Sequence, residues 1–236
     1  MKFPAPLVEG RLLRRYKRFL ADVKLSAGET VIALCANTGS MMGCVDAGNR
    51  VWLSPATGAT RKLAWTWEIV EINGGTLVGI NTHRPNHLVR EAIERGHIPE
   101  LAGYERITPE VRYGAESSRI DWLLETKRRP ACYLEVKNVT AAVSDKVALF
   151  PDAVSDRGTK HLREMMAVVR NGQRAVLCFC VQRGDVKEVR PADQIDPVYG
   201  RTLRQAIDCG VEVIAYRAQV TPSEIHLRYP LPVVCP

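Results

Sequence analysis

The stretch SRIDWLLETKRRPACYLEVKNVT, residues 118–140, decides the fold of the second half of the chain. It contains two apolar segments of strand length, SRIDWLLET and ACYLEVKNV, and each carries charge near its middle. Asp121 lies in the first segment, and Glu135 and Lys137 lie in the second. Because side chains alternate along a strand, Glu135 and Lys137 project from the same face. If the two strands pair as neighbours, Asp121 lies beside them.

Two carboxylates and an ammonium group in apolar surroundings are costly unless they hold a metal ion or one another. Such oxygen ligands suit Mg²⁺, which keeps several waters and takes one or two carboxylates, and Mn²⁺ can substitute for it. The lysine could then orient a water for attack on a phosphodiester. Asp121, Glu135 and Lys137 in this order are the signature of the PD-(D/E)xK nuclease-like fold. The alternative is an ion pair of Lys137 with Asp121 or Glu135 that only neutralises a strand edge.

The segments around this stretch favour an α/β domain. Apolar residues at helical spacing predict a helix over 88–93 that Asn86 caps and Gly96 ends, and a second helix near 156–171. A third, shorter helix is expected near 198–209. Further strands are expected at ERITPEVRYG, AVLCFCVQ and VEVIAYRAQV. The order of helix, three strands, helix, strand, helix and strand agrees with a nuclease-like domain over residues 84–236.

Residues 1–83 have the pattern of a small all-β domain. Five apolar or β-favouring segments alternate with turn signals: RRYKRFLADVKL, ETVIALCA, RVWLSPA, LAWTWEIVEI and TLVGINT. Asn73-Gly74-Gly75 between the last two predicts a hairpin, because Asn and Gly accept positive φ cheaply. The pattern predicts an OB-like five-stranded barrel, and an SH3-like barrel would produce much the same pattern.

The composition limits the class of protein. In 236 residues, 46% are hydrophobic and 25% charged, which excludes disordered and collagen-like chains. No apolar run approaches the roughly 18 residues of a membrane span, so an integral membrane protein is excluded. Seven cysteines without a C-x-x-C pair argue against a zinc ribbon, and with no export signal they lead us to expect a cytoplasmic protein. The net charge of +7 favours a polyanionic partner.

Basic residues concentrate in RLLRRYKR, residues 11–18. If this segment is a strand, cations and an aromatic ring line a groove that suits nucleic acid, with phosphates on the charges and bases on the ring. The alternative is a solvated strand whose charges prevent edge pairing. On such a strand, one face carries Arg14, Tyr16 and Arg18, and the other carries Arg15 and Lys17.

A third carboxylate often completes a nuclease-like site, and it is expected from the first helix of the domain. Glu91 is the preferred candidate, and Glu94 is the weaker one. Glu116 is another acidic neighbour, but it lies only five positions before Asp121. A surface salt bridge is the alternative role for any of these side chains.

Three cations or potential cations crowd the start of the helix predicted near 156–171: Arg157, Lys160 and His161. Asp152 or Ser155 is expected to cap this helix. Cations at a helix N-terminus oppose the macrodipole, so propensity does not explain them, whereas phosphate binding there does. His161 could also move a proton near neutral pH, although a histidine on a helix face more often has a packing role.

Several longer motifs resemble the sugar fermentation stimulation protein A (SfsA) family: RRYKRFLADV at 14–23, NTGSMMGC at 37–44, VRYGAESSRIDWLL at 111–124, YLEVKNVT at 133–140 and FPDAVSDRGTKHLREMM at 150–166. The resemblance implies an OB-like domain followed by a nuclease-like domain. It also implies a cytoplasmic protein that binds DNA without strong sequence preference and is linked to the regulation of sugar, notably maltose, utilisation. Asp121 and Glu135 then match the metal carboxylates, and Lys137 matches the catalytic lysine.

Three functions remain open at this point. The first is a DNA-binding protein that hydrolyses phosphodiesters with Mg²⁺. The second is a DNA-binding regulator that keeps the fold without catalysis. The third is an RNA-binding or RNA-processing protein, since OB-type barrels take either polymer. The intact set of Asp121, Glu135 and Lys137 favours the first.

Overall fold

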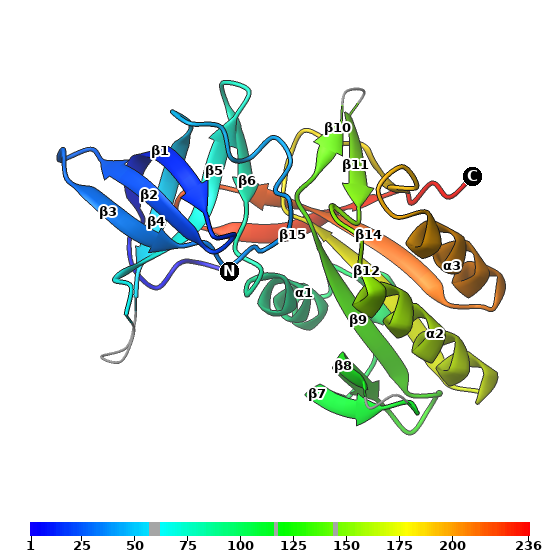
Figure 1. Cartoon of the computed structure of the whole chain (residues 1–236). Helices are drawn as coiled ribbons and strands as arrows, with labels where there is room; N and C mark the ends of the chain where they lie inside the picture. Colours follow the sequence, from blue (N-terminus) through cyan, green and yellow to red (C-terminus); the bar gives the residue numbers. More distant parts are fainter. Residues whose placement is uncertain (57–61, 116–117, 144–145) are drawn as a thin grey trace.

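A β-barrel and an α/β domain make up the chain (Figure 1). The computed structural model describes residues 1–56, 62–115, 118–143 and 146–236. Glu116 lies outside the described residues, and so does the turn signal TGAT at 57–60 between the predicted strands RVWLSPA and LAWTWEIVEI.

The barrel is formed by five strands and closes on itself. Its strands are β1 (Val8–Tyr16), β2 (Leu20–Leu25), β3 (Thr30–Leu34), β4 (Arg50–Pro55) and β5 (Trp65–Ile72). Antiparallel pairings join β3 to β2, β2 to β1, β1 to β4 and β4 to β5, and a parallel pairing of β3 with β5 closes the ring. Leu12, Leu53 and Trp67 fill its interior and are fully buried. The predicted five-stranded OB-like barrel is confirmed.

The prediction of the first strand in this domain, RRYKRFLADVKL, is wrong in one respect. The segment 14–25 is two strands, because Lys17 and Arg18 have φ of 48° and 66° and reverse the chain, so that Tyr16 pairs with Leu20. Arg14, Tyr16 and Arg18 therefore do not share one strand face. The fifth predicted strand, TLVGINT, corresponds to β6 (Thr76–Gly79). It pairs with β5 and is not one of the five strands that close the barrel.

The hairpin predicted at Asn73-Gly74-Gly75 is present between β5 and β6. Ile72 pairs with Thr76, and Asn73 and Gly74 have φ of 49° and 66°. Both values lie in the left-handed region that a tight hairpin turn requires.

The α/β domain is built on a mixed six-stranded sheet of order β15-β14-β12-β9-β8-β7. Helix α1 lies on one face, and α2 and α3 lie on the other (Figure 1). The strands are β7 (Arg106–Tyr113), β8 (Ser118–Glu125), β9 (Cys132–Val139), β12 (Arg174–Val181), β14 (Glu212–Val220) and β15 (Ile225–Leu231); the helices are α1 (Pro85–Glu94), α2 (Asp156–Arg170) and α3 (Pro197–Asp208). None of the described helices is long and apolar enough to cross a membrane.

The expected elements occur in the expected order, and the structure adds the final strand β15 and several smaller elements. A short helix η1 (Pro99–Leu101) follows α1, and a small sheet consists of β10 (Ala142–Val143), β11 (Val147–Phe150) and β13 (Glu188–Pro191). The predicted cap of α1 is wrong: Arg84 holds the N-cap position and Pro85 follows it, so Asn86 lies inside the first turn. The predicted cap of α2 is Ser155, whose Oγ accepts from the N–H of Gly158 at 3.0 Å.

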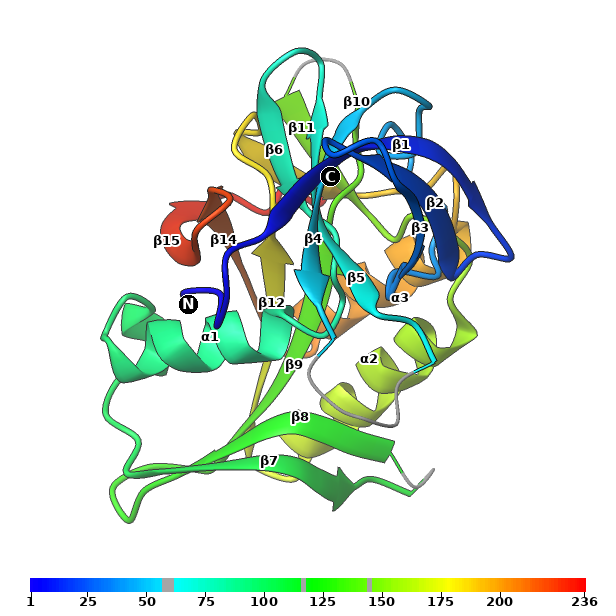
Figure 2. The same cartoon turned by 90° about the vertical axis from the view of Figure 1, so that its left-hand side faces the viewer.

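Strand β8 parts from β9 in the middle of the sheet. The two strands pair only from Trp122 opposite Leu134 to Leu124 opposite Cys132, whereas β9 pairs with β12 along its full length. Figure 2 shows β8 running away from β9 beyond this point. From Glu135 to the end of β9, none of the described strands pairs with this edge. Strand β11 reaches the chain only after β9 ends, where the N–H of Leu149 donates to the carbonyl of Ala141 at 3.0 Å.

The two domains contact each other through backbone and side chains. The N–H of Gly79 in β6 donates to the carbonyl of Gln182 at 2.8 Å, and Val78 forms a bridge with Arg183. Gly79 has no Cβ, and one there would come within 2.6 Å of the Gln182 side chain. The hairpin of β5 and β6 is thereby attached to the end of β12.

Candidate functional site

The acidic and basic side chains predicted at the centre of the chain come together where β8 and β9 part. Lys137 Nζ lies 2.6 Å from Glu135 Oε1, and His161 Nδ1 from α2 contacts the same oxygen. Asp121 is held to β9, because its Oδ2 accepts from the N–H of Val136 at 2.7 Å. The parting of the strands frees this N–H for the carboxylate.

Asn86 forms the fourth side of the cluster. Its Nδ2 donates to Asp121 Oδ1 at 2.9 Å. The first turn of α1 therefore holds one oxygen of the Asp121 carboxylate, while Val136 holds the other. The sequence pattern assigned Asn86 to capping, and this contact depends on how α1 crosses the sheet.

The pKa values of the two carboxylates are shifted in opposite directions. Burial raises the pKa of Asp121, and repulsion from Glu135 raises it further, against hydrogen bonds from Val136 and Asn86. Burial also acts to raise the pKa of Glu135, but Lys137 and His161 outweigh it and lower the net value. Glu135 is thus held ionised, while Asp121 lies in a field that disfavours its charge.

Unsatisfied polar atoms surround Glu135. Glu135 is only 3% exposed, and its Oε2 has no hydrogen-bond partner. The buried hydroxyls of Tyr113 and Tyr199 also have none, and the charge of Glu135 contributes to raising both pKa values after burial itself. An unpaired carboxylate oxygen is costly to bury.

The donor set fits a hard divalent cation. Glu135 Oε2 has no partner in the described part of the chain although protein atoms cover it, and a cation beside it would relieve the repulsion that raises the pKa of Asp121. Among the described residues, no three His, Cys, Asp or Glu side chains form a group ready to hold a metal. A cation here would therefore use Asp121 and Glu135 and complete its shell with water.

His161 is oriented by its neighbours on α2. Arg157 Nε–H donates to His161 Nε2 at 3.5 Å, which leaves Nδ1 as the ring nitrogen that directs a proton to Glu135. The ring is 4% exposed. Arg157 is exposed beside it and Lys160 is half-buried one turn into the helix, so the predicted crowding of cations is present.

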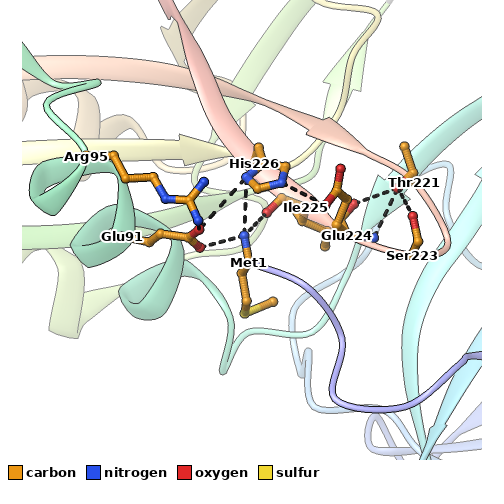
Figure 3. Close-up of polar contacts among 8 residues, drawn as sticks. All are labelled: Met1, Glu91, Arg95, Thr221, Ser223, Glu224, Ile225 and His226. Atoms are coloured by element: carbon orange, nitrogen blue, oxygen red, sulfur yellow. Dashed lines mark hydrogen bonds and ion pairs between the residues drawn. The ribbon is translucent and has the colours of Figure 1, made fainter.

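Glu91 is not brought to this cluster. Figure 3 shows its carboxylate among the Met1 amino group, Arg95 and His226, at 2.5, 2.7 and 4.0 Å. Glu91 therefore links α1 to the N-terminal segment and β15. Glu94, the other candidate from α1, pairs with Arg90 on the helix surface.

The basic segment of the barrel ends in a turn, and some of its cations are engaged by protein groups whereas others are open to solvent. Arg15 donates to the carbonyls of Arg18, Asn37 and Gly39 at 2.7 to 3.0 Å, so it fastens the turn to a second loop. Arg14 pairs with Asp22 and lies over the ring of Tyr16.

The other cations of this turn are more open to solvent. Arg18 is exposed, and its Nε donates to the carbonyl of Thr38. Lys17 is exposed at the tip and has no ionic partner among the described residues. Lys17 is therefore the cation of this turn that is most available to a ligand.

Two arginines outside the predicted set also face solvent. Arg112 of β7 and Arg119 of β8 lie directly opposite each other in the antiparallel ladder, and both are exposed. Neither has an acidic partner among the described residues. Like charges directly opposite on a ladder destabilise it, so this pair does not stabilise the sheet.

Glu164 is a buried carboxylate that the sequence pattern did not single out. It is 4% exposed, and its Oε2 accepts from the N–H of Ala115 at 3.2 Å. Gly114, with φ of 72°, leaves the space that this carboxylate occupies. The position three residues after His161 on α2 is the signal that places it on the same helix face.

Comparisons with known proteins agree with this architecture. The family model described as "SfsA N-terminal OB domain" matches residues 13–80, and "Sugar fermentation stimulation protein RE domain" matches residues 83–224. A sugar fermentation stimulation protein homolog of Geobacter sulfurreducens is 58% identical over 234 residues, covering 99% of each chain. One of Thioalkalivibrio sulfidiphilus is 58% identical over 233 residues, covering 99% of this chain and 98% of its own.

A solved structure covers the whole chain as well. It is described as the structure of Pyrococcus furiosus SfsA in complex with Ca²⁺. The two chains are 28% identical and superpose with a TM-score of 0.89, covering 99% of this chain and 98% of the other.

Proposed function

Because the chain belongs to the sugar fermentation stimulation protein family, we propose that it binds DNA without strong sequence preference and hydrolyses its phosphodiester bonds with a divalent metal ion. The observation that carries this proposal is the cluster of Asp121, Glu135 and Lys137, in which a buried Glu135 oxygen has no partner. The nuclease-like fold and the Ca²⁺ complex of the Pyrococcus furiosus relative support a divalent ion at this place. Mg²⁺ is the ion we expect, with Mn²⁺ as a substitute.

Asp121 and Glu135 are the residues that would hold the ion, which when bound polarises the phosphate and supplies a hydroxide-like nucleophile. Lys137 presents its ammonium group at the same edge, where it can orient the attacking water and stabilise charge that develops on the phosphate. His161 acts on Glu135 in this scheme. It positions the carboxylate through Nδ1 and keeps Oε2 as the free oxygen.

The binding surface is proposed to join cations of both domains. Lys17 and Arg18 at the barrel turn, with Arg14 over Tyr16, suit phosphates and a stacked base. Arg157 and Lys160 lie at the start of α2 beside the cluster, and the pair Arg112 and Arg119 extends the positive charge along β7 and β8. A polyanion would relieve the repulsion within that pair.

The setting of this activity is also part of the proposal. We place the protein in the cytoplasm, because all seven cysteines are free thiols. The names of the relatives refer to sugar fermentation. We infer that the nucleic-acid activity contributes to the regulation of sugar utilisation, including that of maltose.

A cleavage assay tests the proposal. Labelled single-stranded, duplex and branched DNA and RNA are incubated with Mg²⁺, Mn²⁺ or Ca²⁺, and Glu135→Gln and Lys137→Met are compared with wild type. Glu212→Gln is the control, because it removes a carboxylate from an exposed ion pair with Arg174 on β12. We expect metal-dependent cutting of DNA that falls at least about 100-fold in the two cluster variants and not in the control.

Other outcomes separate the alternatives. Binding of DNA with no cutting by any preparation would make the protein a DNA-binding regulator on a nuclease-like fold. Cutting or binding of RNA in preference to DNA would make it an RNA-processing protein. Absence of both binding and cutting would overturn the proposal.

A further inference from the structure

A small polar pocket lies between the barrel and the α/β domain. Its volume is about 210 Å³. Its walls are formed by the loop after β3, by Thr82 before α1, by the end of β9, and by β11 with the segment that follows it. The lining residues used below are Asn37, Thr38, Gly39, Asn138, Thr140 and Asp152.

The chemistry of the walls suits an uncharged group. Among the described residues that line the pocket there is no Lys or Arg, and the one ionisable side chain is that of Asp152. A phosphate would therefore meet a carboxylate and no counter-charge. Amide and hydroxyl groups make up the rest of the polar wall, and these groups recognise neutral donors and acceptors.

Two polar side chains of the pocket belong to largely buried residues and have no protein partner in the part of the chain that the structure describes. Asn37 is 6% exposed and Thr140 is 4% exposed. Among the described residues, neither the Asn37 amino group nor the Thr140 hydroxyl has a hydrogen-bond partner. Because neither atom is fully covered by protein, both remain accessible from the pocket. These two groups are therefore available to hydrogen-bond a ligand or water in that space.

The barrel side of the pocket is rigidly held. Arg15 donates to the carbonyls of Asn37 and Gly39 at 3.0 and 2.9 Å, and Asn37 Oδ1 accepts from the N–H of Gly39. From the other domain, Asp152 Oδ2 accepts from the N–H of Met41 at 3.2 Å and from Ser40 Oγ at 3.4 Å. The loop is thus fixed from both sides, which favours binding by a preformed site.

The pocket lies at the end of β9, just beyond the open edge that holds the carboxylate cluster, where β11 lies beside the chain. Asn138 and Thr140 follow Lys137 by one and three positions. At about 3.3 Å per residue, Thr140 is about 10 Å from Lys137 along the chain. This is about three nucleotide spacings of a stacked strand, at about 3.4 Å each. A strand whose phosphate lies at the cluster can therefore place a nearby base here.

We propose that this interdomain pocket receives one base of the bound nucleic-acid strand, within about three nucleotides of the phosphate at the cluster. Asn37 donates to a base acceptor through its amino group, and the Thr140 hydroxyl supplies a second hydrogen bond. The proposal rests on the proposed nucleic-acid binding and adds to it the place where the barrel and the catalytic domain grip the same strand.

The test uses a set of fluorescein-labelled single-stranded DNA oligonucleotides, each with one abasic position, and binding is measured without divalent metal so that no strand is cut. Wild type is compared with Thr140→Val, which removes a hydroxyl and keeps the shape. Thr202→Val is the control, because it removes a similarly buried hydroxyl in α3, away from the pocket. Thr38→Trp, at an exposed position on the rim, fills the pocket without altering the core.

For wild type and the control, we expect one abasic position to weaken binding about tenfold, in the range of one lost base contact. Thr140→Val and Thr38→Trp should weaken binding of the intact strand and lose their sensitivity to that position. Equal binding of all oligonucleotides by wild type would overturn the pocket and leave the proposed function standing. Sensitivity that persists unchanged in both variants would also overturn it. If wild type binds none of the oligonucleotides, both proposals fall.

Discussion

Arg84 forms a two-pronged ion pair with Glu68 across the junction of the two domains. Arg84 Nη2 lies 2.5 Å from Glu68 Oε1, and Nε donates to Oε2 at 3.0 Å. Glu68 belongs to β5 and is 1% exposed, whereas Arg84 is the N-cap residue of α1. Ser54 and Asn81 donate to the same carboxylate at 2.8 and 2.9 Å. The start of the second domain is therefore fastened to the wall of the barrel.

Replacing Arg84 with alanine should lower the free energy of unfolding by about 3 kcal/mol, because it leaves the buried charge of Glu68 without its counter-ion. Chemical denaturation measures the loss. Glu94→Ala on the same helix is the control, since it breaks an exposed pair with Arg90 and should cost no more than about 0.5 kcal/mol. Similar losses for the two variants would show that the junction pair adds no special stability.

Asp121→Asn should make the metal-free protein more stable at neutral pH while it removes metal binding. The pKa of Asp121 is raised by burial and by Glu135, so its charged form is less favourable folded than unfolded. The gain is therefore absent below the ordinary pKa of 3.8 and appears as the pH rises through the raised value. The measurement is the difference in unfolding free energy between variant and wild type against pH. A difference that shrinks as the pH rises would contradict the assignment.

Arg119→Glu should stabilise the protein and weaken its binding to nucleic acid. The substitution turns a like-charge pair with Arg112 into an opposite-charge pair, which is worth up to about 1 kcal/mol. Affinity for DNA should fall, and the dependence of log affinity on log salt should flatten by about one unit or more. Unchanged affinity would leave the pair with the role of protecting the edge strand β7 from pairing.

Lys17 and Arg15 should separate binding from stability within one turn. Lys17→Ala should change stability by less than about 0.5 kcal/mol and reduce the salt dependence of DNA binding by about one unit. Arg15→Ala should cost about 2 kcal/mol, because it removes charged hydrogen bonds to three carbonyls. Lys24→Ala, an exposed cation on β2 outside the turn, is the control for binding. Equal DNA binding by Lys17→Ala and the control would show that the nucleic-acid-binding surface does not include this turn.

Periodicity was enough to predict the three helices and all strands of the main sheet except β15, because their buried faces repeat along the chain. The hairpin at Asn73-Gly74-Gly75 was predictable for a different reason, since its residues tolerate positive φ. The turn at Lys17 and Arg18 was missed because neither residue type marks a turn. Carbonyl contacts from Arg15, made across the fold, hold that conformation in place.

The candidate site was predictable only in part. Strand alternation places Glu135 and Lys137 together, and the structure shows them in contact. The partners of Asn86 and Glu91 could not be read from the sequence, because they depend on the crossing of α1 over the sheet and on the path of the N-terminal segment. Local spacing shows which residues share a helix face, but it does not show which element packs against that face.

The contact of Gly39 with Asp152 has a consequence for the residue types that position 39 can hold. A Cβ at residue 39 would overlap the Asp152 carboxylate, so the barrel loop and the segment before α2 accommodate each other atom by atom. Any residue other than glycine at position 39 would therefore require the Asp152 carboxylate to move from its contacts with Ser40 and Met41. The absence of a side chain at Gly39 is thus what lets the barrel loop and the α/β domain approach each other this closely.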